Sequence, residues 1–333
     1  MPFSTATVSV MKFSSWARPA QPQAITVHGV QSEKSCALIE RPFNKRHAGF
    51  AAVSLALCLL GFGTIWKLAE ISLALDDNTT SHIALIPFIT AVLIYWDRNK
   101  IFSNLRTSIL PAVAGFAAAG AFLYVRWTYG LAFGAMDQLA LSTAALISAF
   151  LGGFLLFYGS AAFKAGLFPL LFLALTIPIP SKVVSAVVHF LQMGSAATVS
   201  LLFMLTGTPA YRENTIFVLP GVTIEIAEAC SGIRSTLAIV IVTLIAAHLV
   251  LHSNLRKAVL LAVVIPISLF KNAVRIVVLT LLAIHWDMDF LEGSLHRDGG
   301  FLFMLLGLAL MYPILLALAR SEKKTYIDSG VQL

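Results

Sequence analysis

Charged residues are scarce in this sequence. Asp, Glu, Lys and Arg make up 12% of its 333 residues, whereas hydrophobic residues make up 58%. Soluble globular domains contain about 25% charged residues, so this chain lacks the polar surface that a fold of its size needs in water. A soluble protein is therefore excluded, and the length suits one helical membrane bundle with a polar tail.

Acidic residues are scarcer than basic ones, and the formal net charge is +7. A basic chain can bind nucleic acid, but such binding needs a basic patch or stripe. The basic residues here stand at the ends of apolar runs instead: Lys45, Arg46, Arg98, Lys100, Arg256, Lys257, Arg320, Lys323 and Lys324. This is the distribution of positive-inside topology signals. We therefore expect a multi-pass protein of the inner (cytoplasmic) membrane, in contact with lipid and without a nucleic-acid partner.

Cysteine is also rare, with Cys36, Cys58 and Cys230 as its three occurrences. Cys36 lies in a polar tail, Cys58 lies within an apolar run, and neither could meet Cys230 at the outer surface. No disulfide framework is indicated. The sequence contains no HExxH motif, paired metal-ligand cluster, P-loop or GxSxG, so no metal ion, nucleotide or other cofactor is expected.

Apolar runs long enough to cross a membrane need roughly 20 residues. Such runs occur at about 48–68, 80–96, 108–126, 138–158, 231–252, 258–285 and 300–319. If every basic end lies inside, the run 163–207, which Pro178 and Pro180 interrupt, must contain an odd number of crossings. Part of it should then be re-entrant, interfacial or half-length. We expect an all-α transmembrane bundle of about eight spans with both termini cytoplasmic.

Three parts are expected along the chain. Residues 1–47 resemble a flexible cytoplasmic tail rather than a signal peptide, residues 48–319 form the transmembrane domain, and residues 320–333 form a second cytoplasmic tail. Within the domain, residues 214–219 and 222–226 are β-favouring runs around Pro220-Gly221. They predict a small hairpin on the outer face, just before a membrane helix.

Cys230 stands between that hairpin and the start of the next apolar helix. Main-chain N–H groups at a helix N-terminus lower the pKa of a thiol and favour the nucleophilic thiolate. Gly232 allows close backbone approach, and Ser231 can cap the helix. A small buried cysteine without chemistry is the other interpretation of this local pattern.

Two arginines could act with Cys230. Arg234 lies four residues later on the same helix face, where it would hold a thiolate or anchor at lipid headgroups. Arg275 lies with Asn272 inside an apolar run, about ten residues or 15 Å from its outer end. An Arg that faces lipid near the bilayer centre costs at least about 2.5–3.5 kcal/mol, so we expect Arg275 to face the bundle interior. Two interpretations are open for Arg275 in the interior: a functional group, or a structural arginine bonded to carbonyl oxygens.

His296 lies in the polar loop 292–300 before the last apolar run. Histidine can donate and accept protons near neutral pH, although a loop histidine is often only solvated. His285, at the outer end of the preceding run, is a rival for the same role.

Four segments, taken in order, resemble motifs of the exosortase/archaeosortase family. The octapeptide Glu228–Ser235 (EACSGIRS) resembles the family signature, and Asn272–Ile276 resembles its Asn-x-x-Arg motif. His296 with Gly300 resembles its C-terminal His motif. Ser81-His82 and Pro87 resemble its early Ser-His-Gly segment, with Ile83 in place of the Gly. The resemblance covers about residues 60–319.

The resemblance implies a membrane cysteine transpeptidase, which is a peptide-bond hydrolase or transferase, with Cys230, Arg275 and His296 as its catalytic residues. Glu228, Ser231, Arg234 and Asn272 are expected to support them. It also implies membrane-anchored substrate proteins that end in a short motif (Pro-Glu-Pro in many bacteria), a transmembrane helix and a basic tail. Cleavage would occur at the periplasmic or exterior face, followed by transfer to a surface glycolipid or polysaccharide acceptor, in association with exopolysaccharide production.

Two other functions remain open from the residues. A polytopic transporter would suit the broken run at Pro178 and Pro180 and the intramembrane Arg275. It would leave the cysteine at the outer end of a helix unexplained, and no inverted repeat is visible. A non-catalytic scaffold for polysaccharide export is the second alternative.

Overall fold

The structure is a computed structural model that describes residues 32–74, 80–287 and 300–328. The chain divides into two compact units, Met1–Lys45 and Arg46–Leu333. Helix α1 (Ser32–Leu60) begins within the segment expected to be a flexible tail. All contacts described below lie within the second unit.

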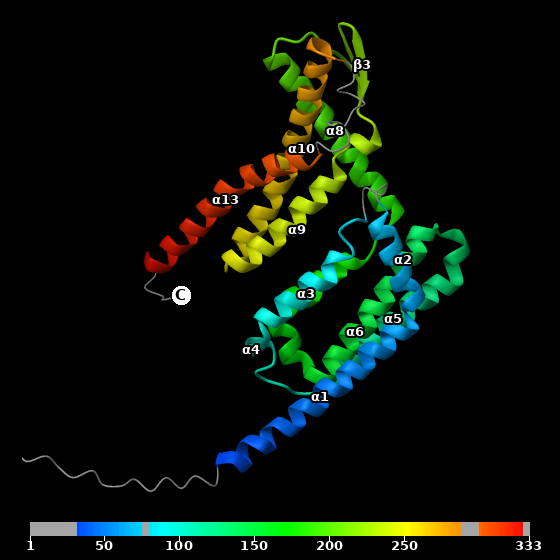
Figure 1. The fold of residues 1–333 in the computed structure, drawn as a ribbon, viewed down its shortest axis with the longest axis vertical. Helices are drawn as coiled ribbons and strands as arrows, with labels where there is room; N and C mark the ends of the chain where they lie inside the picture. The colour runs from blue at the N-terminus through cyan, green and yellow to red at the C-terminus, as the bar shows by residue number, and fades with distance from the viewer. Residues whose placement is uncertain (1–31, 75–79, 288–299, 329–333) are drawn as a thin grey trace, which may run out of the picture. The chain divides into compact units, whose positions relative to one another are not determined.

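The described part of the chain is mostly helical, as the apolar runs predict (Figure 1). After α1 come α2 (Phe62–Leu73), α3 (Leu85–Trp96), α4 (Arg98–Ile101), α5 (Ile109–Tyr129), α6 (Ala135–Ala165), α7 (Leu167–Phe172), α8 (Ser181–Leu205), α9 (Ile233–Val250), α10 (Asn254–His285) and α13 (Gly300–Asp328). Short 3₁₀ turns are η1 (Gly130–Ala132), η2 (Leu173–Thr176) and η3 (Glu228–Cys230). The strands are β1 (Tyr211–Glu213), β2 (Ile216–Leu219) and β3 (Val222–Glu225).

Within the described residues, six helices are long and apolar enough to cross a membrane: α5 with η1, α6, α8, α9, α10 and α13. A seventh crossing results if residues 45–60 and α2, which meet at a bend of 71°, count as one span. The expected count of about eight differs at 80–96, where α3 has 12 residues. Such a helix is about 18 Å long, shorter than the roughly 30 Å hydrocarbon core.

The run 163–207 divides as the charge pattern predicts. Its first half forms the short apolar helix Leu167–Thr176, and its second half forms the 25-residue helix α8. Ile177 is extended and Pro180 precedes α8, because a proline lacks the N–H group that a continuing helix would need. The run therefore contains one helix long enough to cross the membrane, α8, and one half-length helix, instead of two crossings.

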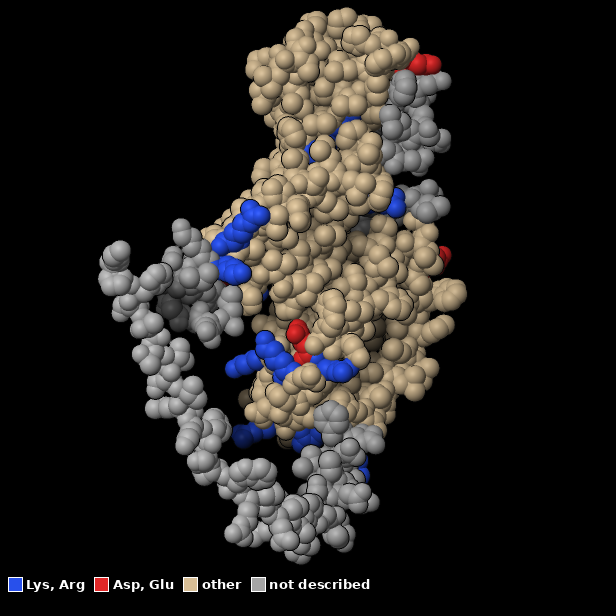
Figure 2. Space-filling view, turned by 60° about the vertical axis from the view of Figure 1, so that its left-hand side comes forward, with Lys and Arg blue, Asp and Glu red and all other residues tan. Residues whose placement is uncertain are grey.

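Large apolar side chains cover the outer surface of the spanning helices. In α5, for example, Leu110 is 82% exposed and Trp127 is 89% exposed. The face drawn in Figure 2 carries scattered charged side chains among a surface of mostly uncharged residues. Water would disfavour so much exposed apolar area, so this surface belongs against lipid.

Helices α5 and α6 pack with their backbones in close contact. A Cβ atom added at Gly115 would lie 2.8 Å from the Cα atom of Gly152, and one added at Gly152 would lie 3.1 Å from the carbonyl oxygen of Ala112. Small residues allow membrane helices to approach this closely and to gain van der Waals contact. The pair α5–α6 is thus fixed by its glycines.

Several chain segments with basic residues meet at one end of the second unit. Arg46 donates a hydrogen bond to the carbonyl oxygen of Leu105 at 3.0 Å. His248, near the end of α9, lies 3.3 Å from the Asp97 carboxylate. The carboxylate of Glu322 in α13 accepts hydrogen bonds from the turn that precedes α10. The contacts therefore agree with the expected grouping of these segments on one side of the membrane.

The predicted hairpin is present, with one additional strand. The sheet has the order β1-β2-β3 and is antiparallel throughout. Phe217 pairs with Ile224, and Leu219 pairs with Val222 across the Pro220-Gly221 turn. Gly221 adopts φ +83°, the left-handed conformation that a type II turn requires after proline.

One face of this sheet packs on α8 and α10, as Figure 1 shows for β3. Buried residues alternate with exposed ones along β2 and β3; the buried ones include Phe217 and Ile224, and Ile226, just after β3, is buried too. They contact Phe203 of α8 and Val277 of α10 within one apolar cluster. This packing fixes the end of β3, from which the chain turns toward Cys230.

Candidate active site

Cys230 is positioned by a short sequence of turns between β3 and α9. The N–H group of Ile226 donates to Thr215 at the end of the sheet, and the N–H group of Ala227 donates to the Glu225 carbonyl oxygen. The 3₁₀ turn η3 follows and ends at Cys230, whose N–H group donates to the Ala227 carbonyl oxygen at 2.9 Å. Cys230 thus lies three residues before α9 begins at Ile233.

Gly232 makes the turn into α9 possible. It adopts φ +75°, and an added Cβ atom would lie 2.7 Å from Oδ1 of Asn272. The predicted close backbone approach at this glycine is confirmed. The predicted capping by Ser231 is wrong, because the residue before the helix is Gly232 and no side chain of the described residues caps α9. Ser231 Oγ is buried without a hydrogen-bond partner among the described residues.

Asn272 holds the cysteine loop on α10. Its Nδ2 atom donates to the main-chain carbonyl oxygen of Cys230 at 3.0 Å and to Ser195 Oγ of α8 at 3.0 Å. The side chain is buried, at 2% exposure. Asn272 therefore joins three elements, α8, α10 and the loop that carries Cys230.

Lys271, one residue earlier, fixes the start of α9. This side chain is also 2% exposed, and its Nζ atom donates a hydrogen bond to Ser235 Oγ. Ser235 Oγ in turn donates to the carbonyl oxygen of Gly232 at 3.0 Å. The sequence shows Lys271 beside Asn272 and Ser235 at the end of the octapeptide, but it gives no signal that the two side chains meet.

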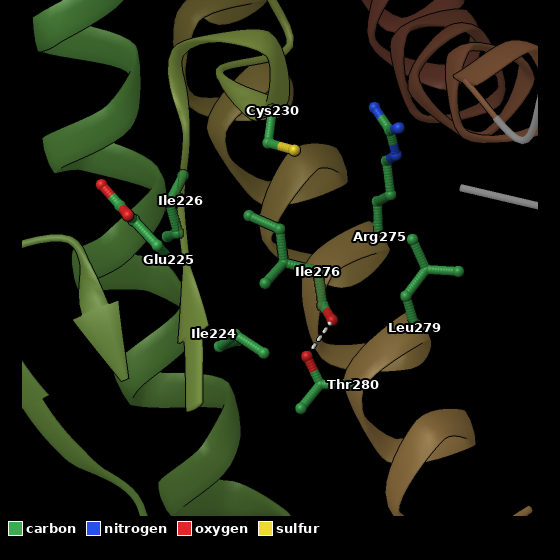
Figure 3. A pocket seen from close by; sticks show the side chains of 8 residues that line it. All are labelled: Ile224, Glu225, Ile226, Cys230, Arg275, Ile276, Leu279 and Thr280. Atoms are coloured by element: carbon green, nitrogen blue, oxygen red, sulfur yellow. Dashed lines mark hydrogen bonds between the residues drawn. The ribbon is translucent and has the colours of Figure 1, made fainter. Parts of the chain in front are cut away.

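Arg275 and Cys230 line the same pocket (Figure 3). The pocket lies between the last part of β3 and one side of α10, and its lining residues are Ile224, Glu225, Ile226, Cys230, Arg275, Ile276, Leu279 and Thr280. Arg275 projects from α10, and the Cys230 thiol points toward that helix. The side chain of Arg275 therefore faces a pocket of the protein rather than lipid alone, as expected for an arginine in a membrane helix.

Two opposing effects act on the Cys230 thiol. Burial raises its pKa above the ordinary value, and the positive charge of Arg275 lowers it. Burial is the larger effect, so the expected lowering of the pKa at a helix N-terminus is wrong in direction. The physical reason is burial of the thiol, which outweighs the positive charge of Arg275. Arg275 favours the thiolate.

The remaining predicted residues lie outside the pocket lining or outside the described residues. Arg234 is exposed on α9, and Glu228 is exposed at the start of η3. His296 lies outside the described residues. His285 is exposed at the end of α10, with Nδ1 2.8 Å from the Leu281 carbonyl oxygen. His82 stands in the turn before α3, where burial lowers its pKa.

No group of three His, Cys, Asp or Glu side chains within the described ranges is arranged to hold a metal ion. The pocket lining includes a thiol and a guanidinium, from Cys230 and Arg275, beside the carboxylate of Glu225 and the hydroxyl of Thr280. A thiolate can attack a carbonyl carbon, and a guanidinium can stabilise a negative charge nearby. This combination suits acyl transfer.

Comparison with known families supports the same chemistry. A family described as Transmembrane exosortase (Exosortase_EpsH) matches residues 66–313, which is well over half of the 333-residue chain. Neither a curated protein nor a solved structure matches. Exosortases are generally cysteine transpeptidases, and membership implies a multi-pass membrane protein that acts in PEP-CTERM protein sorting. The chain thus belongs to the transmembrane exosortase family.

Proposed function

We propose that Cys230, Arg275 and His296 of this exosortase cleave C-terminal sorting signals and transfer the released protein to a surface acceptor. The observation that carries the proposal is the pocket that Cys230 and Arg275 share beside the hairpin. A thiol and an arginine meet there, although they are 45 residues apart in the sequence. The family motifs, taken in order along the chain, point to the same two residues, Cys230 and Arg275.

Cys230 is the nucleophile. Its Sγ atom attacks the carbonyl carbon of the scissile peptide bond, which gives a tetrahedral intermediate and then a thioester with release of an amine. The hydrogen bond from Asn272 holds the Cys230 main chain while this occurs. Positioning of this kind contributes to the rate because the reacting atoms must meet in one geometry.

Arg275 stabilises negative charge at two stages. Its positive charge lowers the pKa of the Cys230 thiol and thereby favours the thiolate. The same guanidinium can hold the oxyanion of the tetrahedral intermediate, because it lines the pocket that the scissile carbonyl would enter.

His296 transfers protons. It protonates the leaving amine and later removes a proton from the acceptor group that attacks the thioester. His296 lies four residues before α13 begins at Gly300, and α13 packs against α9 and α10. Helix α9 follows Cys230 in the chain, and α10 carries Arg275. The packing of α13 against these two helices supports a position of His296 close to the same site.

The substrates are membrane-anchored proteins with a short C-terminal motif, a transmembrane helix and a basic tail. Their helix enters the bundle from the side, so that the scissile bond reaches Cys230 at the periplasmic or exterior face of the inner membrane. The position of Cys230 supports this orientation. Helix α9, which has 18 residues and a length of about 27 Å, separates Cys230 from the end where His248 meets Asp97.

The test replaces Cys230 by Ala and by Ser in the full-length chain, expressed together with a reporter that carries such a C-terminal signal. We expect both variants to insert in the membrane and to leave the reporter uncleaved, as judged by its size on immunoblots. Cys58→Ala is the matched control, because Cys58 is an exposed cysteine of α1. Normal cleavage by Cys230→Ala would refute the proposal.

A further inference from the structure

Within the part of the chain that the structure describes, β3 is an edge strand, and its unpaired side lies at the pocket. The sheet order β1-β2-β3 leaves β3 with one neighbouring strand among the described residues. Ile224, Glu225 and Ile226, which form the end of β3 and the residue after it, line the pocket together with Cys230. Figure 3 shows β3 running beside α10, with Cys230 beyond its end.

The pairing pattern identifies which main-chain groups of β3 face outward. The N–H group of Ile226 donates to Thr215, so this pair is hydrogen-bonded. Such pairs alternate along an antiparallel ladder, so Ile224 and Val222 also bond to β2. Thr223 and Glu225 therefore direct their main-chain groups away from β2.

Three of these outward groups have no partner among the described residues. The Glu225 carbonyl oxygen accepts a hydrogen bond from Ala227. The N–H and C=O groups of Thr223 and the N–H group of Glu225 take part in no hydrogen bond of the described sheet. Exposed edge groups of this kind are the donors and acceptors that an added strand uses.

Charge at the pocket indicates which extended chain would fit. Arg275 lines the pocket from α10, whereas the carboxylate of Glu225 points away from that helix in Figure 3. Arg275 is therefore the lining group that an acidic side chain of a bound peptide would meet.

We propose that β3 binds the cleavage segment of the substrate protein as an added fourth strand, with an acidic side chain of that segment beside Arg275. Thr223 and Glu225 hold the extended main chain, and the residues that follow pass Cys230 Sγ. The sheet thus sets the distance between the bound segment and the scissile bond. The inference rests on the proposed function, since it names how the same site takes its substrate.

The first experiment removes outward N–H groups from β3. Thr223→Pro and Glu225→Pro each delete one N–H group. That group faces the pocket edge rather than β2, and a strand tolerates proline at such a position. We expect each variant to slow reporter cleavage roughly threefold to tenfold, because a hydrogen bond to the substrate is lost.

The opposite edge of the same sheet supplies a matched control. Arg212 of β1 pairs with Phe217 and directs its N–H group away from β2, so Arg212→Pro also removes an outward N–H group. It additionally loses the bond from Arg212 Nε to the Asn214 carbonyl oxygen and is the harsher test of sheet stability. We expect Arg212→Pro to cleave the reporter normally. Equal rates for all three proline variants and the unaltered protein would overturn the inference.

A second experiment does not depend on how proline is tolerated. Thr223→Cys is combined with Cys230→Ala, Cys36→Ala and Cys58→Ala, and single cysteines are placed at successive positions of the reporter's cleavage segment. Oxidation should cross-link the position opposite Thr223 and, more weakly, the positions two residues to either side. The positions between them should not react, because side chains of an added strand alternate between the two faces and a disulfide needs Cα atoms within about 7 Å. Cross-links spaced three or four residues apart, or none at all, would overturn the inference.

The two proposals can fail separately. If Cys230→Ala still cleaves the reporter, the proposed function fails. If Cys230→Ala abolishes cleavage while the proline variants of β3 cleave normally and no alternating cross-links form, the strand pairing alone is wrong.

Discussion

Asn272 donates a hydrogen bond from Nδ2 to the main-chain carbonyl oxygen of Cys230 at 3.0 Å. The same amide donates to Ser195 of α8. One side chain of α10 therefore sets the position of the nucleophile relative to two helices. Arg275 lies three residues later on α10, so the same helix positions both the Cys230 loop and the arginine.

Replacing Asn272 by Ala should remove both bonds and leave the Cys230 carbonyl oxygen without this donor. We expect reporter cleavage to fall about tenfold or more, since an unsatisfied buried group costs about 1–3 kcal/mol and the loop is released. Ser195→Ala is the control, because it removes the α8 contact and keeps the bond to Cys230. If both variants lost activity equally, packing of α8 rather than positioning of Cys230 would be the role of Asn272.

Gly232→Ala should be more damaging than the same substitution at another left-handed glycine. Both Gly232, at φ +75°, and Gly207, at φ +69°, would suffer the backbone cost of about 1–2 kcal/mol. Only at Gly232 does the new methyl group collide with Asn272 Oδ1, since no atom lies within 4 Å of a Cβ at Gly207. Thermal unfolding in detergent and reporter cleavage should both rank Gly207→Ala nearer to the unaltered protein. The reverse ranking would contradict the described contact.

The pH dependence of Cys230 alkylation should report on Arg275. Iodoacetamide reacts with the thiolate, so the rate rises as the pH passes through the pKa of the thiol. Burial raises that pKa and Arg275 lowers it, so Arg275→Met should shift the profile to higher pH. Measurement in a chain that lacks Cys36 and Cys58 isolates the reaction of Cys230.

Arg234→Met is the control for this charge effect. Arg234 is exposed on α9 and does not line the pocket, so the alkylation profile should stay in place. A shift of equal size in Arg234→Met would mean that general surface charge, rather than the arginine in the pocket, acts on the thiol.

Glu322→Ala should destabilise the contact between α13 and the start of α10. The buried Glu322 carboxylate accepts hydrogen bonds from the N–H groups of Ser253 at 2.6 Å and His252 at 3.0 Å, and it pairs with Arg256 at 3.4 Å. Charge-assisted bonds of this kind contribute about 1.5–3 kcal/mol each, so the unfolding temperature in detergent should fall clearly. Glu70→Ala, at an exposed position of α2, should leave it unchanged. Equal unfolding temperatures would show that the cap adds nothing to stability.

The sequence predicts the helical bundle, the hairpin and the meeting of Cys230 with Arg275, because each depends on a local pattern or an ordered motif. The apolar runs predict the spans, and Pro220-Gly221 predicts the turn of the hairpin. The half-length helix after α6 follows from the charge pattern and from Pro178 and Pro180.

The remaining features depend on partners that lie far apart in the chain. Ser195 meets Asn272 across 77 positions, and Ser235 meets Lys271 across 36. No local pattern encodes such pairs. The direction of the Cys230 pKa shift also needed the tertiary structure, since burial by residues of other elements decides it. The 12-residue length of α3 is not visible in the sequence either, because the run is apolar from Ile83, before the helix begins at Leu85.

Lys271 has a consequence for how the protein enters the membrane. Together with Arg275 it gives α10 two positive charges that must pass through the bilayer to reach the outer face, and each costs about 2.5–3.5 kcal/mol as it passes the centre. Ser235, the hydrogen-bond partner of Lys271, belongs to α9 and is therefore synthesised before α10. Insertion of α9 and α10 as a helical hairpin lowers this cost, whereas α10 alone would carry an unsatisfied ammonium group into lipid. We therefore expect biogenesis of the bundle and assembly of the cysteine loop to depend on the same pair of side chains, Lys271 and Ser235.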